Sequence, residues 1–228
     1  MTEPRFDEDG AQRFRCALSD SETQQILAAL AGLPSDTAGV RIAGASGLAS
    51  CLAATGAMGA IAEALIGPDA FPVRAVLFDK TVDRNWSLAW HQDRTIVVKR
   101  RIDTPDYGPW SIKAGLQHVA PPFEILAGMA TLRLHLDPVD STNAPLFVAL
   151  GSHRLGRLTV DRIAEVVDRL ETLACFAEAG DVWAYSTPIL HASEAAARPA
   201  RRRVLQVDYA ARTLDGDLEW LGLNQGRR

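Results

Sequence analysis

From residue 71 onward, the chain is a succession of short segments of strand-forming residues separated by turn residues. Short segments bounded in this way predict β-strands. The predicted strands span residues 73–78, 86–93, 95–100, 130–136, 146–150, 173–177, 182–185, 190–192 and 204–209. Many short strands in succession favour a closed or double-sheet antiparallel barrel over a parallel α/β sheet.

Helical patterns lie mainly before these strands. Ser19 with Glu22 forms a capping-box pattern, and the Ala- and Leu-rich stretch behind it predicts a helix to about Leu30. A second helix is predicted over about 48–65, and a third, over about 160–170, interrupts the strands. The sequence therefore predicts a mainly β fold with flanking α-helices.

The predicted helices and strands divide the chain into two parts. The helical part should cover about 19–66 and the barrel core about 71–210. No internal repeat or low-complexity linker separates them. We therefore expect a single domain over residues 1–228.

Composition narrows the class of protein. The chain is 47% hydrophobic and 23% charged, with a net charge of −4, which gives no electrostatic reason to expect a nucleic-acid or membrane partner. The three cysteines are widely spaced and fit a reducing cytosol. The N-terminus lacks a signal-peptide pattern, and no run approaches 18 apolar residues. We expect a cytoplasmic protein with a small-molecule substrate, and the sequence does not predict its oligomeric state.

His91 and Asp93 lie two residues apart in a strand-like segment. Side chains alternate between the faces of a strand, so these two should project to the same side. Two histidines and one carboxylate on one face suit a divalent transition metal, as in non-haem Fe(II) oxygenases. A second histidine is therefore needed from elsewhere, and His191 provides it.

The other histidines are weaker candidates for a metal ligand. We expect His118, near two prolines, to lie in a loop or on the surface, and His153 to make a structural hydrogen bond. His135 is a rival to His91 because Asp137 follows it at the same spacing. A small barrel with an early ligand pair and a late histidine needs about four intervening strands, which favours the earlier pair.

An arginine run, Arg201 to Arg203, follows His191 and opens an apolar strand. A guanidinium can hold a carboxylate bidentately, although such runs are usually solvated turns. Strand alternation would point Arg203 inward if the apolar face lined the barrel. It would point Arg202 inward if helices covered the outside and the interior were polar.

Together these motifs resemble the phytanoyl-CoA dioxygenase family of Fe(II)/2-oxoglutarate oxygenases, over roughly residues 77–209. The motifs are Asn85-Trp86, Trp90-His91-Gln92-Asp93, Leu136-Asp137 to Asn143, Pro145-Leu146, Gly151-Ser152-His153-Arg154, Gly180-Asp181, and His191-x-Ser193 with Arg202. Two turns depart from the family, with Asn143-Ala144 in place of Asn-Gly and Leu150-Gly151 in place of Pro-Gly. These departures bear on loop shape more than on chemistry.

The resemblance implies a double-stranded β-helix, that is, a cupin-like jelly roll. It implies that His91, Asp93 and His191 bind Fe(II) and that Arg202 and Ser193 hold the distal carboxylate of 2-oxoglutarate, with Arg203 as the second choice. The reaction would consume 2-oxoglutarate and O2 and release succinate and CO2. Because Asp93 is present where related halogenases have a small residue, we expect hydroxylation or another oxidation of a small molecule.

Further pocket residues are predicted with less support from the pattern. Gln92 and Trp110 are candidates for contact with the cosubstrate, and Lys80 for contact with the substrate. Arg133 alternates with leucines along 130–137, so it either faces water or lines the pocket and receives a carboxylate. Two other functions stay open: a non-catalytic or regulatory jelly-roll protein that binds metal, and a cupin-type metal enzyme that does not use 2-oxoglutarate.

Overall fold

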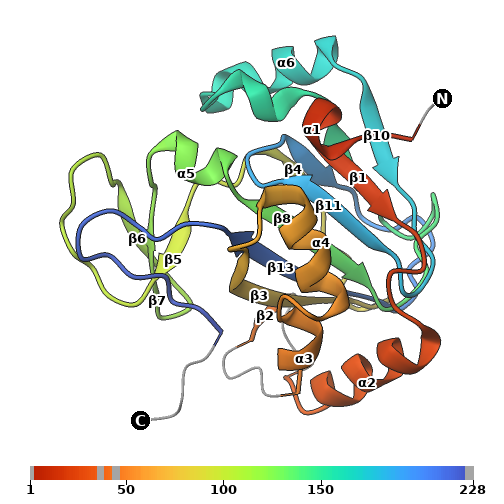
Figure 1. Ribbon diagram of the computed structural model, residues 1–228. Helices are drawn as coiled ribbons and strands as arrows, with labels where there is room; N and C mark the ends of the chain where they lie inside the picture. Colours follow the sequence, from red (N-terminus) through yellow and green to blue (C-terminus); the bar gives the residue numbers. More distant parts are fainter. Residues whose placement is uncertain (1–2, 35–38, 43–46, 224–228) are drawn as a thin grey trace.

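The computed structural model describes residues 3–34, 39–42 and 47–223, and Figure 1 shows the arrangement of its elements. A six-stranded antiparallel sheet, the major sheet, has the order β1-β11-β8-β13-β3-β2. Its strands are β1 (Ala11–Phe14), β11 (Val182–Ser186), β8 (Ala130–His135), β13 (Arg202–Ala210), β3 (Phe71–Lys80) and β2 (Gly39–Arg41). A four-stranded sheet, the minor sheet, faces it with the order β10-β9-β12-β4. Its strands are β10 (Thr172–Cys175), β9 (Leu146–Ala149), β12 (His191–Ser193) and β4 (Leu88–His91).

A small third sheet has the order β5-β7-β6, with β5 at Ile96–Val98, β7 at Leu116–Val119 and β6 at Trp110–Lys113. The helices are α1 (Phe6–Asp9), α2 (Asp20–Leu30), α3 (Ala49–Leu52), α4 (Ala57–Ile66), α5 (Phe123–Ala127) and α6 (Ile163–Arg169). Two short 3-10 turns cover Ser152–Leu155 and Val160–Arg162. The prediction of a mainly β protein with flanking helices is confirmed.

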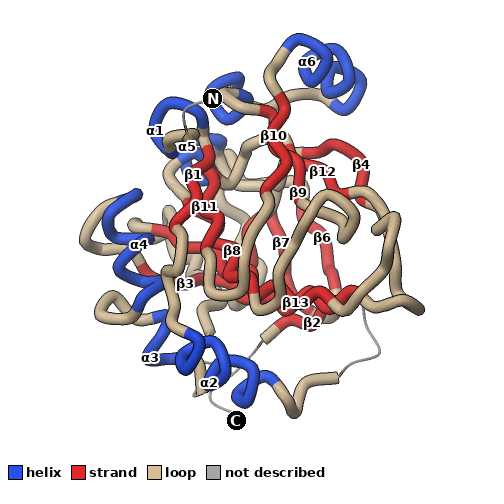
Figure 2. The backbone as a smooth tube through the Cα atoms, turned by 90° about the vertical axis from the view of Figure 1, so that its right-hand side faces the viewer, coloured by secondary structure: helices blue, strands red, loops and turns tan. Residues whose placement is uncertain are grey.

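Helices cover the outer face of the major sheet. Figure 2 shows α2, α3 and α4 on one side of this sheet and the minor sheet on the other. The largest apolar cluster joins these helices to outward-facing strand residues, among them Leu132, Leu205 and Val207. Because apolar residues of β13 face the helices, the residues that alternate with them face the interior between the two sheets. The face of the major sheet that lies toward the minor sheet is therefore the polar face.

The nine strands predicted from sequence are all present, with bounds shifted by a few residues at most. The capping box at the start of α2 is also present, since the Ser19 hydroxyl accepts from the Glu22 N–H and the Glu22 carboxylate accepts from the Ser19 N–H. Strands β1, β2, β6 and β7 were not predicted. The helix expected over 160–170 begins as a 3-10 turn and continues as α6.

The predicted helix over 48–65 is two helices, because the chain breaks between α3 and α4. Gly56 and Gly59 make the break possible: a Cβ on either residue would lie about 2 Å from a backbone carbonyl oxygen of the preceding turn. In the described residues, one stretch, Ala49–Ile66, is long and apolar enough by length and composition to cross a membrane. The expectation that no run approaches this length is corrected, although the break leaves two helices each too short to span.

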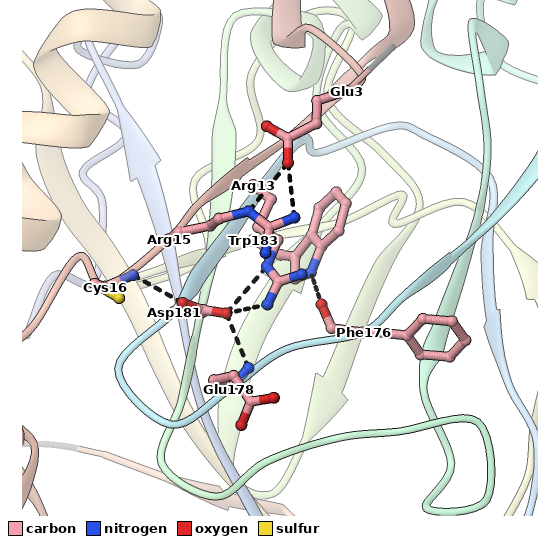
Figure 3. A network of polar contacts seen from close by, with 8 residues as sticks. All are labelled: Glu3, Arg13, Arg15, Cys16, Phe176, Glu178, Asp181 and Trp183. Carbon is pink, nitrogen blue, oxygen red and sulfur yellow. Dashed lines mark hydrogen bonds and ion pairs between the residues drawn. The ribbon is translucent and has the colours of Figure 1, made fainter. Parts of the chain in front are cut away.

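The N-terminal strand β1 forms an edge of the major sheet, and hydrogen bonds to Asp181 hold it beside β11. As Figure 3 shows, this carboxylate accepts from Arg13 and from the backbone N–H groups of Cys16 and Glu178. Burial alone would raise the pKa of Asp181, but the bond from Arg13 and the two N–H bonds outweigh burial and lower it. The Gly180-Asp181 motif is thus a structural junction between β1 and β11.

Candidate active site

The three predicted ligands come together between the sheets. His91 ends β4 and His191 begins β12, and these residues are direct partners in the antiparallel register. Asp93 follows β4 on the same face as His91, as the alternation predicts. One ligand atom from each residue lies within 4.8 Å of the others. The distant parts of the sequence therefore form one group of donors.

The backbone fixes which nitrogen each imidazole offers. Nδ1 of His91 lies 2.8 Å from the Ala89 carbonyl oxygen, and Nδ1 of His191 lies 3.0 Å from that of Ile189. A carbonyl oxygen only accepts, so each Nδ1 carries the proton and each Nε2 keeps a lone pair. Burial lowers the pKa of His191 to about 4, against the opposing effect of Asp93. Each ring is thus oriented to offer Nε2 to a metal.

A buried network positions Asp93. Arg74 on β3 lies 3.7 Å from an oxygen of Asp93 and donates through Nε to Asp208 at 2.5 Å. Asp208 also accepts from Thr131 at 3.1 Å, and Thr131 bonds to Thr187 at 3.0 Å. Burial alone would raise the pKa of Asp93, but Arg74 and then His191 outweigh it and lower it. The carboxylate is therefore kept ionised, as a metal ligand must be.

A cavity of about 230 Å³ opens beside these three residues. Polar and charged side chains line much of it, together with an apolar group from β3, β9, β4 and the segment before β4. The polar and charged lining residues are Arg41, Arg74, Lys80, His91, Asp93, Arg133, His191, Ser193, Arg202 and Gln206. The apolar group is Val76, Phe78, Trp86, Leu88 and Leu146. The predicted residues Arg202, Ser193, Lys80 and Arg133 all line this cavity.

Arg202 points into the cavity, whereas Arg203 points out and pairs with Asp137 at 2.6 Å. The side chain of Arg202 is buried, donates to the Ala144 carbonyl oxygen and has no partner for its Nε among the described residues. Burial, and after it the charge of Arg133, lowers the pKa of Arg202 to about 9. The interior is polar because helices cover the apolar face of β13, so Arg202 and not Arg203 is among the residues that line the cavity.

Lys80 lies beside Arg202 at the same end of the cavity. Its Nζ donates to the Ser193 hydroxyl at 3.2 Å and to the carbonyl oxygens of Trp86 and Glu194 at 2.7 and 3.0 Å. Burial is the main cause that lowers the pKa of Lys80 to about 8, followed by the charges of Arg202 and Arg133. A cluster of cations without a carboxylate partner is costly in a buried place, and an anionic ligand would relieve that cost.

Arg133 is buried and faces the cavity, so the interpretation of a water-facing strand is wrong. One Nη donates to Gln206 at 2.7 Å, and the guanidinium lies 5.5 Å from the centre of the Phe78 ring. Its Nε is buried without a hydrogen-bond partner among the described residues. Arg133 is thus a buried cation of the cavity lining, in line with the other interpretation of the 130–137 pattern.

Two predicted cosubstrate residues do not reach the cavity. The Gln92 amide donates to the carbonyl oxygens of Gly156 and Pro188 and accepts from the Leu158 N–H. Because side chains alternate along the strand, the Gln92 side chain points away from the face that carries His91 and Asp93. It connects the end of β4 to neighbouring loops through these hydrogen bonds. Trp110 lies in the small third sheet, packs in a separate apolar cluster and stacks with Arg101. Neither Gln92 nor Trp110 is among the residues that line the cavity.

The remaining histidines are placed as follows. His118 is buried on β7, so the expectation of a loop or surface position is wrong, and burial lowers its pKa to about 4. His135 is buried in the interior with neither ring nitrogen bonded among the described residues, and it is not part of the ligand group. The Nδ1 of His153 also lacks a hydrogen-bond partner among the described residues, and the His153 ring packs against Gly10.

Sequence reasoning missed three residues that line the cavity and one that pairs with them. They are Arg41, Arg74 and Gln206 in the lining, and Asp208, the partner of Arg74. Arg74 and Asp208 lie in phase with predicted inward positions of β3 and β13, so alternation could have found them once Arg202 was placed inside. The turn with Ala144 in place of glycine keeps a left-handed backbone, with φ of 52°. The carbonyl oxygen of Ala144 is the one that accepts from Arg202.

Comparison with known proteins gives likeness in structure alone. No protein-family model matches the sequence, and no curated protein matches it. The structure of EctD from S. alaskensis with 2-oxoglutarate and 5-hydroxyectoine has a TM-score of 0.67 at 20% identity, covering 98% of this chain and 79% of EctD. The carbocyclase SnoK, which is non-haem and 2-oxoglutarate dependent, has a TM-score of 0.64 at 20% identity, covering 97% of this chain and 86% of SnoK.

HygX from Streptomyces hygroscopicus, with nickel and 2-oxoglutarate bound, has a TM-score of 0.61 at 15% identity, covering 93% of this chain and 89% of HygX. Likeness at such identity establishes the fold and not the reaction. Together with the two facing antiparallel sheets, it confirms the predicted jelly roll.

Proposed function

We propose that this protein is an Fe(II)- and 2-oxoglutarate-dependent oxygenase that oxidises a small molecule and releases succinate and CO2. The observation that carries the proposal is one cavity that joins a His-Asp-His donor group to a buried, incompletely bonded arginine. A jelly roll needs neither feature to fold. Both are what an iron site with a dicarboxylate cosubstrate requires.

The donor set fits Fe(II). His91 and His191 would bind through Nε2, since each Nδ1 is committed to a backbone carbonyl, and Asp93 would bind as a carboxylate. Two imidazoles and one carboxylate leave open positions for further ligands, as in non-haem oxygenases. Bound iron would supply the activation of O2 that oxidises the substrate. Arg74 would orient Asp93, and the buried surroundings of His191 would limit access of water.

The cationic end of the cavity fits the distal carboxylate of 2-oxoglutarate. Arg202 and Ser193 would hold it, as the family resemblance implies, and Lys80 lies within hydrogen-bond distance of Ser193. The distal carboxylate of 2-oxoglutarate would also accept charge-assisted hydrogen bonds from the Arg202 guanidinium, whose Nε has no partner among the described residues. The EctD and HygX structures hold 2-oxoglutarate, which supports the same cosubstrate here.

We retain several finer points as parts of the proposal. The chain would belong to the phytanoyl-CoA dioxygenase family, form one domain and act in the cytoplasm without a nucleic-acid partner. The reaction would be hydroxylation or another oxidation, since Asp93 occupies the position that halogenases leave open. SnoK, a carbocyclase, is an example of an outcome other than hydroxylation on this fold.

Anaerobic titration with Fe(II) and 2-oxoglutarate tests the proposal. A weak visible charge-transfer band should appear for the wild type and be absent in His91→Ala and Asp93→Ala. Arg202→Gln should weaken 2-oxoglutarate binding while leaving metal binding intact, and Arg203→Gln is the matched control on the other face. If no band forms and no succinate appears across a broad panel of small molecules, a metal-binding protein without turnover is the better conclusion.

A further inference from the structure

Charge in the cavity exceeds what iron and 2-oxoglutarate account for. Five cationic side chains line it, and Asp93 is the one carboxylate among its described lining residues. Arg74 has carboxylate partners in Asp93 and Asp208. The other four form no ion pair with a described residue, and they are Arg41, Lys80, Arg133 and Arg202.

The following inference rests on the proposed function, that is, on Fe(II) and 2-oxoglutarate as ligands. These two ligands do not remove the excess of positive charge in the cavity. Fe(II) brings two positive charges and 2-oxoglutarate two negative charges, so together they leave the net positive charge of the cavity unchanged. Arg202 and Lys80 would meet the distal carboxylate of the cosubstrate. Arg133 and Arg41 then remain, one deep in the cavity and one at its edge. Unpaired cations inside a protein are costly, so a further anion is expected there.

Arg41 is placed to meet that anion. It lies on the edge strand β2 and pairs in register with Val76, an inward-facing residue of β3, so its side chain faces the cavity. Its Nε is buried without a hydrogen-bond partner among the described residues. Burial, and after it the charge of Arg74, lowers its pKa. Arg41 is half-buried, whereas Arg133 and Arg202 are buried, which places Arg41 nearest to solvent among these three arginines.

The surroundings of Arg41 also constrain the rest of the ligand. Trp86 is half-buried and Leu88 is 48% exposed, and both line the same cavity. Apolar side chains and an arginine that line one cavity suit a molecule with an apolar body and one charged end. Arginine holds a carboxylate or phosphate through two parallel hydrogen bonds, which gives orientation as well as affinity.

We propose that the substrate is an organic anion with an apolar body, and that Arg41 is the specificity-determining residue that binds its carboxylate or phosphate group. Arg41 would hold the charged end while Trp86 and Leu88 contact the apolar part. A neutral substrate would leave the guanidinium without its partner.

Benzoate and its neutral counterpart benzamide are suitable probes, because they differ mainly in charge. The protein is loaded with Mn(II), which is paramagnetic, and saturated with 2-oxoglutarate so that Arg202 is occupied. Proton relaxation of each probe is then measured against probe concentration. Benzoate should relax saturably, and benzamide should bind at least tenfold more weakly, as expected for loss of a charge-assisted contact.

Variants assign the effect to one residue. Arg41→Gln should weaken benzoate binding by roughly tenfold or more, and Arg41→Lys should retain part of the affinity. Arg100→Gln removes the same charge from an exposed position outside the cavity and should change nothing. Circular dichroism checks that each variant folds. No saturable relaxation by benzoate, equal binding of benzamide, or unchanged binding in Arg41→Gln would each overturn the proposal. Failure of the Fe(II)–2-oxoglutarate band would instead count against the proposed function.

Discussion

Replacement of Arg74 by methionine should destabilise the protein strongly and weaken its metal site. The guanidinium lies between two carboxylates, at 2.5 Å from Asp208 and 3.7 Å from Asp93. Its side chain is 19% exposed, and that of Asp208 is 6% exposed. Removal of Arg74 would leave Asp208 buried without its ionic partner and Asp93 without its main stabilising charge.

The magnitude follows from the burial of this pair. Removing one partner of a buried ion pair costs about 3–5 kcal/mol, because the other charge is left uncompensated. For a chain of this size, each kcal/mol lowers Tm by about 2–4 °C, so a loss on the order of 10 °C is expected. The double variant Arg74→Met with Asp208→Leu should recover most of the loss, since it removes the charge that the single variant leaves buried.

Thermal and urea unfolding of the four members of this cycle measure the coupling. The pH dependence gives a second check. Burial already raises the pKa of Asp208, and without Arg74 that pKa should rise further. The pKa of Asp93, which Arg74 lowers, should rise above that of the unfolded chain. The single variant should then lose stability as pH rises through the unfolded value of about 4 and regain it toward acid pH.

The same substitution bears on metal affinity. Arg74 helps to keep Asp93 ionised, so its loss should let protons compete with the metal at higher pH. Partners that orient a metal ligand typically contribute 10–100-fold to affinity, and Ni(II) titration should show a loss of about that size. A loss of less than about 1 kcal/mol in stability, with additive single and double variants, would refute the reasoning about this network.

Three further predictions concern neighbouring residues. Affinity for 2-oxoglutarate should fall as pH rises above about 8, because Lys80 loses its proton there, and Lys80→Met should flatten that pH profile in calorimetric titration. His135→Leu should keep metal binding and lose no stability in urea unfolding, since it removes two buried ring nitrogens without partners, whereas His191→Leu should lose the metal. Gln92→Ala should lower unfolding free energy by about 1–3 kcal/mol, because the Leu158 N–H and two carbonyl oxygens lose their partner, and should leave Ni(II) stoichiometry unchanged.

Alternation along strands made the core of the site predictable from sequence. His91 and Asp93 share a face for this reason, and the same rule put Arg202 and Arg203 on opposite faces. The rule did not say which face was inside. That answer came from α2 and α4, which cover the apolar side of β13. A local sequence pattern therefore cannot predict the role of a residue when that role depends on which layer covers the sheet.

Strands held mainly by distant partners escaped prediction. Strand β1 has no apolar alternation, and its conformation follows from pairing with β11. The hairpin of β6 and β7 turns at Ala114 and Gly115, both at positive φ, where an Asn-Gly pair would have been a clear signal. Missing that hairpin also misplaced His118, which lies on β7. The glycines that divide α3 from α4 act through close packing that a helical pattern does not show.

The junction at Asp181 has a consequence for how the chain reaches its native state. Arg13 and Asp181 are separated by 168 positions, and among the described strands β1 pairs with β11 alone. During synthesis the first strand must therefore wait until almost the whole polypeptide has emerged, and His191 follows shortly after. Pairing across such separations slows folding, because loop closure precedes any gain from contact. The sheet edge and the complete donor group should accordingly form late, so a chain truncated before residue 181 would lack the strand that pairs with β1 and the third donor, His191.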